Sequence, residues 1–158
     1  MHRGCRVAEQ TVARVWIDGN RCGLSGAVAS IVLVEEHEVF GAIGEDGFTR
    51  LIAAFYRQIA DDDILGPMYK GRDMAAAEKR LRDFLIYRFG GPQNYIEERG
   101  HPRLRMRHAP FVIDQAARDR WLTLMKKAFE EAKLPDAPAE VLALFLDSTA
   151  TAMINRLS

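Results

Sequence analysis

The 158-residue sequence predicts an all-α fold, and three observations lead to that prediction. From Val39 onward, apolar residues recur at steps of three and four, which is the spacing of one helix face. Capping residues and helix breakers stand at the ends of these apolar runs. The sequence contains no sustained alternation of apolar and polar residues and no hairpin dipeptide between apolar runs, so nothing in it predicts a strand.

The first predicted helix starts near Val39 and ends at the acidic run 61–63. A second helix follows Asp73, whose carboxylate can cap it, and stops at the breaker sequence 90–92. The apolar face of the first helix consists of Phe48, Leu51, Ile52, Phe55, Tyr56 and Ile59, and that of the second of Ala77, Leu81, Phe84 and Leu85.

The segment 93–110 predicts only short helical pieces, because it contains Gly100, Pro102 and Pro110. Two longer helices follow. Asp114 can cap the first of them, and the last starts at Asp136. Their apolar faces consist of Trp121, Leu124, Met125 and Ala128, and of Val141, Leu142, Phe145, Leu146, Thr149 and Met153.

Length and composition favour one helical domain, residues 37–158, preceded by an N-terminal extension, residues 1–36. A chain of 158 residues can bury a sizeable core without disulfides. Residues 1–36 lack clear periodicity and contain several glycines, so we expect them to be partly disordered or to form one short helix.

The composition favours a cytoplasmic protein without nucleic-acid or membrane partners. Basic and acidic residues number 22 each, so no long-range attraction to an anionic polymer is built in. Cys5 and Cys22 both lie in the extension and cannot cross-link the remaining chain. The apolar run 27–34 is far shorter than the roughly 20 residues of a membrane span, and we recognise no export signal.

A metal or haem site would have to use one of four histidines. His2 lies in the extension, His37 stands among glutamates and is expected in solvent, and His101 is expected in a turn between a glycine and a proline. His108 precedes an apolar turn and a new helix, where a neutral imidazole could bind haem iron. Its local sequence also leaves a purely structural role open.

Other site chemistries find little support. No cysteine or histidine pair has the spacing of a zinc site, and no nucleotide-binding or acyl-transfer motif is present. A lone histidine suits haem, which brings its own ring nitrogens as ligands. Tyrosine and tryptophan side chains are ordinary core residues on helices, but several of their O–H and N–H groups converging on one cavity would suit a diatomic ligand.

The chain resembles the truncated haemoglobins of group II, the O type, over Val39 to Asn155. The residues that carry the resemblance are Phe55-Tyr56, Gly90-Gly91-Pro92, the run from Gly100 to Phe111, Arg118-Asp119 and Trp121-Leu122. The resemblance implies a truncated globin fold, a two-over-two helical sandwich, that binds haem b. Where the family often has a double glycine before its second helix, this chain reads Gly44-Glu45-Asp46-Gly47.

The resemblance implies that His108 is the proximal iron ligand. On the distal side it implies that Tyr56, Tyr69 and Trp121 surround the gas ligand, with Tyr69 in the loop after the first helix. Ala77 takes the entry position, where many globins have a histidine. The remaining implied haem contacts are Leu81 over the iron, the packing residues Phe84 and Phe111, and the propionate contacts Arg80 and Tyr95. Arg105 and Arg107 are alternative propionate contacts, or else they form a solvated basic face.

The function implied by the resemblance is reversible binding of dioxygen and other diatomic gases. Nitric oxide or peroxide redox chemistry, and a separate reductase that would support it, stay open, and no residue is assigned a catalytic role. The chain could be a monomer or a homodimer. The alternative is a globin-fold sensor or interaction module without a role in oxygen transport.

Overall fold

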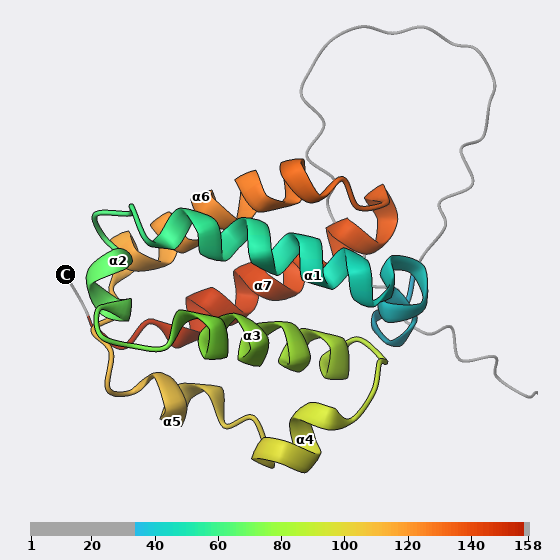
Figure 1. Ribbon diagram of the computed structural model, residues 1–158, viewed down its shortest axis with the longest axis horizontal. Helices are drawn as coiled ribbons and strands as arrows, with labels where there is room; N and C mark the ends of the chain where they lie inside the picture. The colour runs from blue at the N-terminus through green and yellow to red at the C-terminus, as the bar shows by residue number, and fades with distance from the viewer. Residues whose placement is uncertain (1–33, 157–158) are drawn as a thin grey trace, which may run out of the picture. The chain divides into compact units, whose positions relative to one another are not determined.

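The computed structural model describes residues 34–156, which form helices and no strand (Figure 1). Expectations for Cys5, Cys22, His2 and most of the N-terminal extension lie outside the described residues. The elements are a short 3-10 helix, η1 (Glu36–Glu38), and the α-helices α1 (Val39–Ile59), α2 (Gly66–Tyr69), α3 (Met74–Arg88), α4 (Asn94–Arg99), α5 (Leu104–His108), α6 (Gln115–Ala132) and α7 (Asp136–Met153).

The four long helices form two antiparallel pairs, α1 with α3 and α6 with α7 (Figure 1). Helix α1 also packs against α6 and α7, so the two pairs form one sandwich. The short helices α4 and α5 follow α3, with α4 packed against α3 and α5 packed against α7. This arrangement confirms the predicted truncated globin fold. No helix described between residues 34 and 156 is long and apolar enough to cross a membrane.

The core is centred on the predicted apolar face of α1. All six residues of that face are buried, and Phe48 and Phe55 are fully enclosed. Burying one such side chain stabilises a fold by about 1.5–3 kcal/mol. Burial of the apolar face of α1 therefore contributes much of the free energy that stabilises the sandwich.

Both predicted helix caps are present. The carboxylate of Asp73 accepts a hydrogen bond from the N–H of Ala76 at 3.0 Å and begins α3. Asp114 accepts one from the N–H of Ala117 at 2.8 Å and begins α6. These local hydrogen bonds satisfy N–H groups that have no partner inside the helix, and they confirm the predicted starts of both helices.

Helix α1 is interrupted at Gly44, which has φ 71° and ψ 167°. The backbone therefore changes direction between the first turn after Val39 and the long apolar face. The interruption lies in the segment Gly44-Glu45-Asp46-Gly47, which stands where the family often has a double glycine before its second helix. Glycine suits Gly44 because other residues rarely adopt a positive φ.

Candidate functional site

His108 is the last residue of α5 and is half-buried. Its Nδ1 lies 2.8 Å from the carbonyl oxygen of Leu104, one helical turn earlier. A carbonyl oxygen only accepts hydrogen bonds, so this contact requires a proton on Nδ1 and leaves the lone pair of Nε2 free. An imidazole oriented in this way is the form that ligates haem iron. The donor chemistry of His108 therefore fits a haem.

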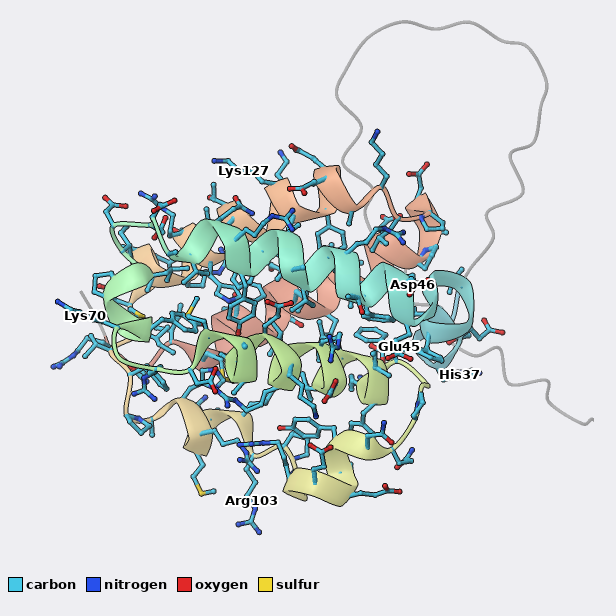
Figure 2. The ribbon with its side chains drawn as sticks, viewed as in Figure 1. His37, Glu45, Asp46, Lys70, Arg103 and Lys127 are labelled. Carbon is cyan, nitrogen blue, oxygen red and sulfur yellow. The ribbon has the colours of Figure 1, made fainter. Side chains whose placement is uncertain are left out.

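The other described histidines lie where the sequence predicted them. His37 is exposed in η1 and lies far from α5 (Figure 2). His101 is exposed in the turn before α5, and its Nδ1 accepts a hydrogen bond from the N–H of Arg103 at 3.2 Å. Arg103 itself projects away from the helices at the start of α5 (Figure 2).

Arg107 braces the segment that leads into α5. Its Nε donates to the carbonyl oxygen of Pro102 at 2.7 Å, and its Nη2 donates to that of Arg99 at 2.9 Å. The guanidinium group thereby satisfies the carbonyl of the last residue of α4. Arg107 therefore binds backbone carbonyls, whereas the sequence suggested a propionate contact or a solvated basic face. Arg105 is exposed.

Tyr56 and Tyr69 lie side by side. Tyr56 is buried on α1, and Tyr69 is the last residue of the short helix α2 rather than part of a loop. Their ring centroids are 5.9 Å apart and the ring planes are perpendicular. Burial raises the pKa of Tyr56 above its ordinary value of 10.0, and the neighbouring Tyr69 hydroxyl raises it further. Burial also raises the pKa of Tyr69, so both hydroxyls keep their protons at neutral pH.

Phe55 connects these tyrosines to Trp121. The ring centroid of Phe55 lies 5.3 Å from that of Tyr56 and 5.1 Å from that of Trp121, which is half-buried on α6. Three helices therefore bring these residues into one row of aromatic contacts, in the order Tyr69, Tyr56, Phe55 and Trp121. We call Phe55, Tyr56, Tyr69 and Trp121 the distal aromatic cluster.

Helix α3 places the residues predicted for the haem wall on its apolar side. Ala77 and Phe84 are buried, and Leu81 is half-buried. The positive charge of Arg80 partly offsets the burial that raises the pKa values of Tyr56 and Tyr69. Arg80 therefore acts electrostatically on Tyr56 and Tyr69, an effect that the sequence did not predict for it.

Tyr95 is a buried member of an aromatic group that includes Phe84 of α3. Its ring centroid lies 5.4 Å from that of Phe84 and 6.2 Å from that of Tyr87. Phe84 also contacts Phe145 of α7, with the ring centroids 6.3 Å apart. Sequence reasoning did not assign Tyr87 or Phe145 to the site, although the apolar period of the last helix had already placed Phe145 on its inner face.

Phe111 lies close to His108 and also to Arg72, a cation that the sequence did not single out. Its ring centroid is 6.2 Å from that of His108, and the guanidinium carbon of Arg72 lies 4.4 Å above the ring. The side chain of Asn155 also contacts this turn. Arg72 and Asn155 lie outside the helices, where no periodic pattern marks them.

The Bacterial-like globin family matches residues 38–155 of the chain. Among curated proteins, the group 2 truncated hemoglobin YjbI of Bacillus subtilis is 37% identical over 117 residues, which cover 74% of this chain and 88% of that protein. The family match includes every α-helix of the described structure, because α1 begins at Val39 and α7 ends at Met153.

Solved structures with the same fold come from several bacteria. The thermostable hemoglobin of Thermobifida fusca is 47% identical, with a TM-score of 0.71 over 74% of this chain and 96% of that one. The hemoglobin of Chloroflexus aurantiacus is 40% identical, with a TM-score of 0.72 over 75% and 98%. The truncated oxygen-avid haemoglobin of Bacillus subtilis is 37% identical, with a TM-score of 0.71 over 74% and 98%.

Proposed function

The chain belongs to the bacterial-like globin family as a group II truncated haemoglobin, and from this premise we propose that it binds haem b and reversibly binds dioxygen and other diatomic gases. The observation that carries the proposal is the hydrogen bond between His108 Nδ1 and the Leu104 carbonyl, which leaves Nε2 free as a ligand. Covalent haem attachment would need a Cys-x-x-Cys-His sequence, which the chain lacks, and this favours haem b.

The proximal side would hold the haem through His108. Phe84 and Leu81 on α3, together with Phe111 after α5, supply apolar and aromatic surface of the kind that packs against a porphyrin ring. Arg80 and Tyr95 stay our candidates for the propionates. When bound, the haem would supply the iron coordination position for a diatomic gas.

The distal aromatic cluster would hold the gas ligand through hydrogen bonds. Tyr56 and Tyr69 keep their hydroxyl protons at neutral pH, because burial raises their pKa values. The indole N–H of Trp121 can only donate a hydrogen bond. A hydrogen bond to a charged group contributes about 1.5–3 kcal/mol. Such donors slow the release of a polarised ligand, and a relative with this fold is an oxygen-avid haemoglobin.

The physiological reaction and setting belong to the same proposal. Nitric oxide or peroxide redox chemistry would use the same distal donors and would need electrons from a separate reductase. We place the protein in the cytoplasm as a monomer or homodimer, with a globin domain at residues 37–158, which the family match at 38–155 supports.

The absorption spectrum of the purified protein with added haem tests the proposal. We expect a Soret band at one haem per chain, lost in His108→Ala or rescued there by imidazole. His37→Ala and His101→Ala are matched controls and should leave the spectrum unchanged. An unchanged spectrum in His108→Ala would overturn the ligand assignment, and a wild-type chain that takes up no haem would favour the sensor or interaction module.

A further inference from the structure

The turn after His108 is tied to the C-terminal segment by the side chain of Asn155. Its Nδ2 donates to the carbonyl oxygen of Phe111 at 2.9 Å and to that of His108 at 3.3 Å. Its Oδ1 accepts from the N–H of Ile113 at 3.0 Å, and its backbone N–H donates to the Ile113 carbonyl oxygen at 2.9 Å. One residue therefore holds both ends of the turn 108–113.

We propose that Asn155 is a positioning residue for His108, which keeps the imidazole in the orientation required to ligate haem iron. This inference rests on the proposed function. Helix α5 contains five residues, and a helix this short is unstable without outside contacts. Arg107 braces its N-terminal side through the carbonyls of the preceding turn, and Asn155 holds its C-terminal side.

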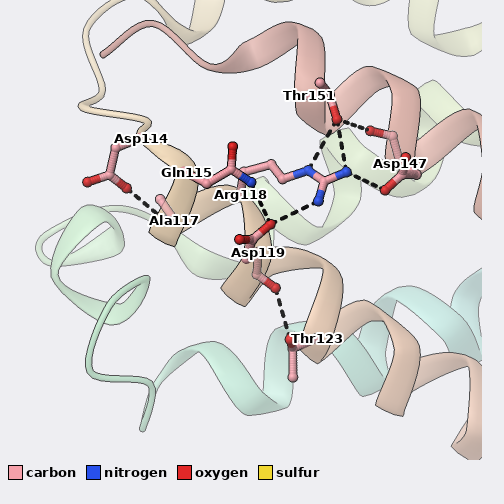
Figure 3. A network of polar contacts seen from close by, with 8 residues as sticks. All are labelled: Asp114, Gln115, Ala117, Arg118, Asp119, Thr123, Asp147 and Thr151. Atoms are coloured by element: carbon pink, nitrogen blue, oxygen red, sulfur yellow. Dashed lines mark hydrogen bonds and ion pairs between the residues drawn. The ribbon is translucent and has the colours of Figure 1, made fainter. Parts of the chain in front are cut away.

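Asn155 acts from a firmly held support. It lies two residues after the end of α7, and Arg118 of α6 binds the last turns of that helix (Figure 3). The guanidinium group of Arg118 pairs with Asp147 and donates to Thr151 Oγ1 at 2.9 Å. The C-terminal segment is thereby anchored to α6 before it reaches the turn.

The contacts bear directly on the backbone of His108. Its carbonyl oxygen accepts from the N–H of Phe111 at 3.0 Å as well as from Asn155. Without these contacts the backbone of His108 could shift, and such a shift would move the ring relative to the Leu104 carbonyl. Loss of the Asn155 donor should therefore change the orientation of the imidazole, not only the stability of the fold.

Two substitutions separate the acceptor of Asn155 from its donor. Asn155→Ala removes both. Asn155→Asp keeps an oxygen that can accept from the Ile113 N–H but places a second oxygen against the carbonyls of His108 and Phe111. Asn94→Asp, at an exposed position at the start of α4, is the matched control for the change in charge.

The readouts are the iron–histidine stretching band of the ferrous protein, the rate of haem loss, and hydrogen exchange of the Ile113 amide in the haem-free protein. Both Asn155 variants should shift the band and speed haem loss about tenfold or more, as removal of a residue that orients a metal ligand does. Ile113 exchange should rise in Asn155→Ala and much less in Asn155→Asp. Asn94→Asp should match the wild type in all three.

An unchanged band and haem-loss rate in both Asn155 variants would overturn the inference, even if their thermal midpoints fell, because Asn155 would then only stabilise the fold. A wild-type chain without haem would instead show that the proposed function fails. The two failures are distinguishable, since the second appears before any residue is substituted.

Discussion

The rings of Phe55 and Trp121 lie with their centroids 5.1 Å apart at an interplanar angle of 55°, and this contact joins α1 to α6 beside Tyr56. Phe55 is fully buried, whereas Trp121 is half-buried. Part of the indole therefore packs in the core while the rest is exposed. The packing of Trp121 and its proposed hydrogen bond to a gas ligand can consequently be tested separately.

Trp121→Phe keeps most of the ring that contacts Phe55 but removes the indole N–H. Loss of one hydrogen bond of about 1.5–3 kcal/mol corresponds to a roughly tenfold to hundredfold faster release of dioxygen. Stopped-flow dissociation from the ferrous protein measures this rate. A rate equal to that of the wild type would show that Trp121 is a packing residue only.

Tyr56→Phe and Tyr69→Phe should each speed dioxygen release, and their effects should not add. The two rings are in contact, so either hydroxyl can reorient when the other is removed. The rates of both single variants and the double variant give the coupling energy. Strictly additive effects would mean that the hydroxyls act on the ligand independently.

Asp62 should make stability depend on pH in the acid range. Burial tends to raise its pKa, but the N–H groups of Leu65 and Ile64 and the guanidinium group of Arg120 outweigh burial and lower the pKa below 3.8. The folded-state pKa is thus depressed, so this stabilisation is present above pH 3.8 and is lost as the pH falls through the lower folded-state value.

Asp62→Asn should therefore lower the free energy of unfolding at neutral pH, on the order of 1 kcal/mol. Urea unfolding across the acid range should show this difference shrinking as wild-type Asp62 becomes protonated. Asp63→Asn is the control, because Asp63 pairs with the same Arg120 but its side chain is 78% exposed, and such pairs contribute little. Equal losses of unfolding free energy in both variants would contradict the stabilising role given to Asp62.

Gly90→Ala should destabilise the fold by at least about 1–2 kcal/mol from the positive φ alone. Gly90 has φ 94°, and an added Cβ would lie 2.0 Å from the carbonyl oxygen of His37. Gly71→Ala is the control for backbone strain, since Gly71 has φ 75° and no atom within 4 Å of an added Cβ. Thermal unfolding should show the larger loss of stability for Gly90→Ala. Equal losses in the two variants would mean that the backbone of His37 shifts away from the added Cβ without destabilising the fold.

The helices and the core could be predicted from the sequence because their signals are local. The apolar period of α1 identified its buried face, and Asp73 and Asp114 marked the starts of α3 and α6 through hydrogen bonds to residues three positions later. His108 could be singled out from its neighbours and from the resemblance to truncated haemoglobins.

The sequence by itself thus determined the order of the four long helices and the starts of α3 and α6, while only the tertiary structure decided how the turn after His108 is held. Asn155 reaches His108 across 47 positions and Ile113 across 42. Arg107 braces a turn whose carbonyls no pattern marks as acceptors. Polar side chains outside helices have no periodicity, and their partners are set only when distant segments pack together.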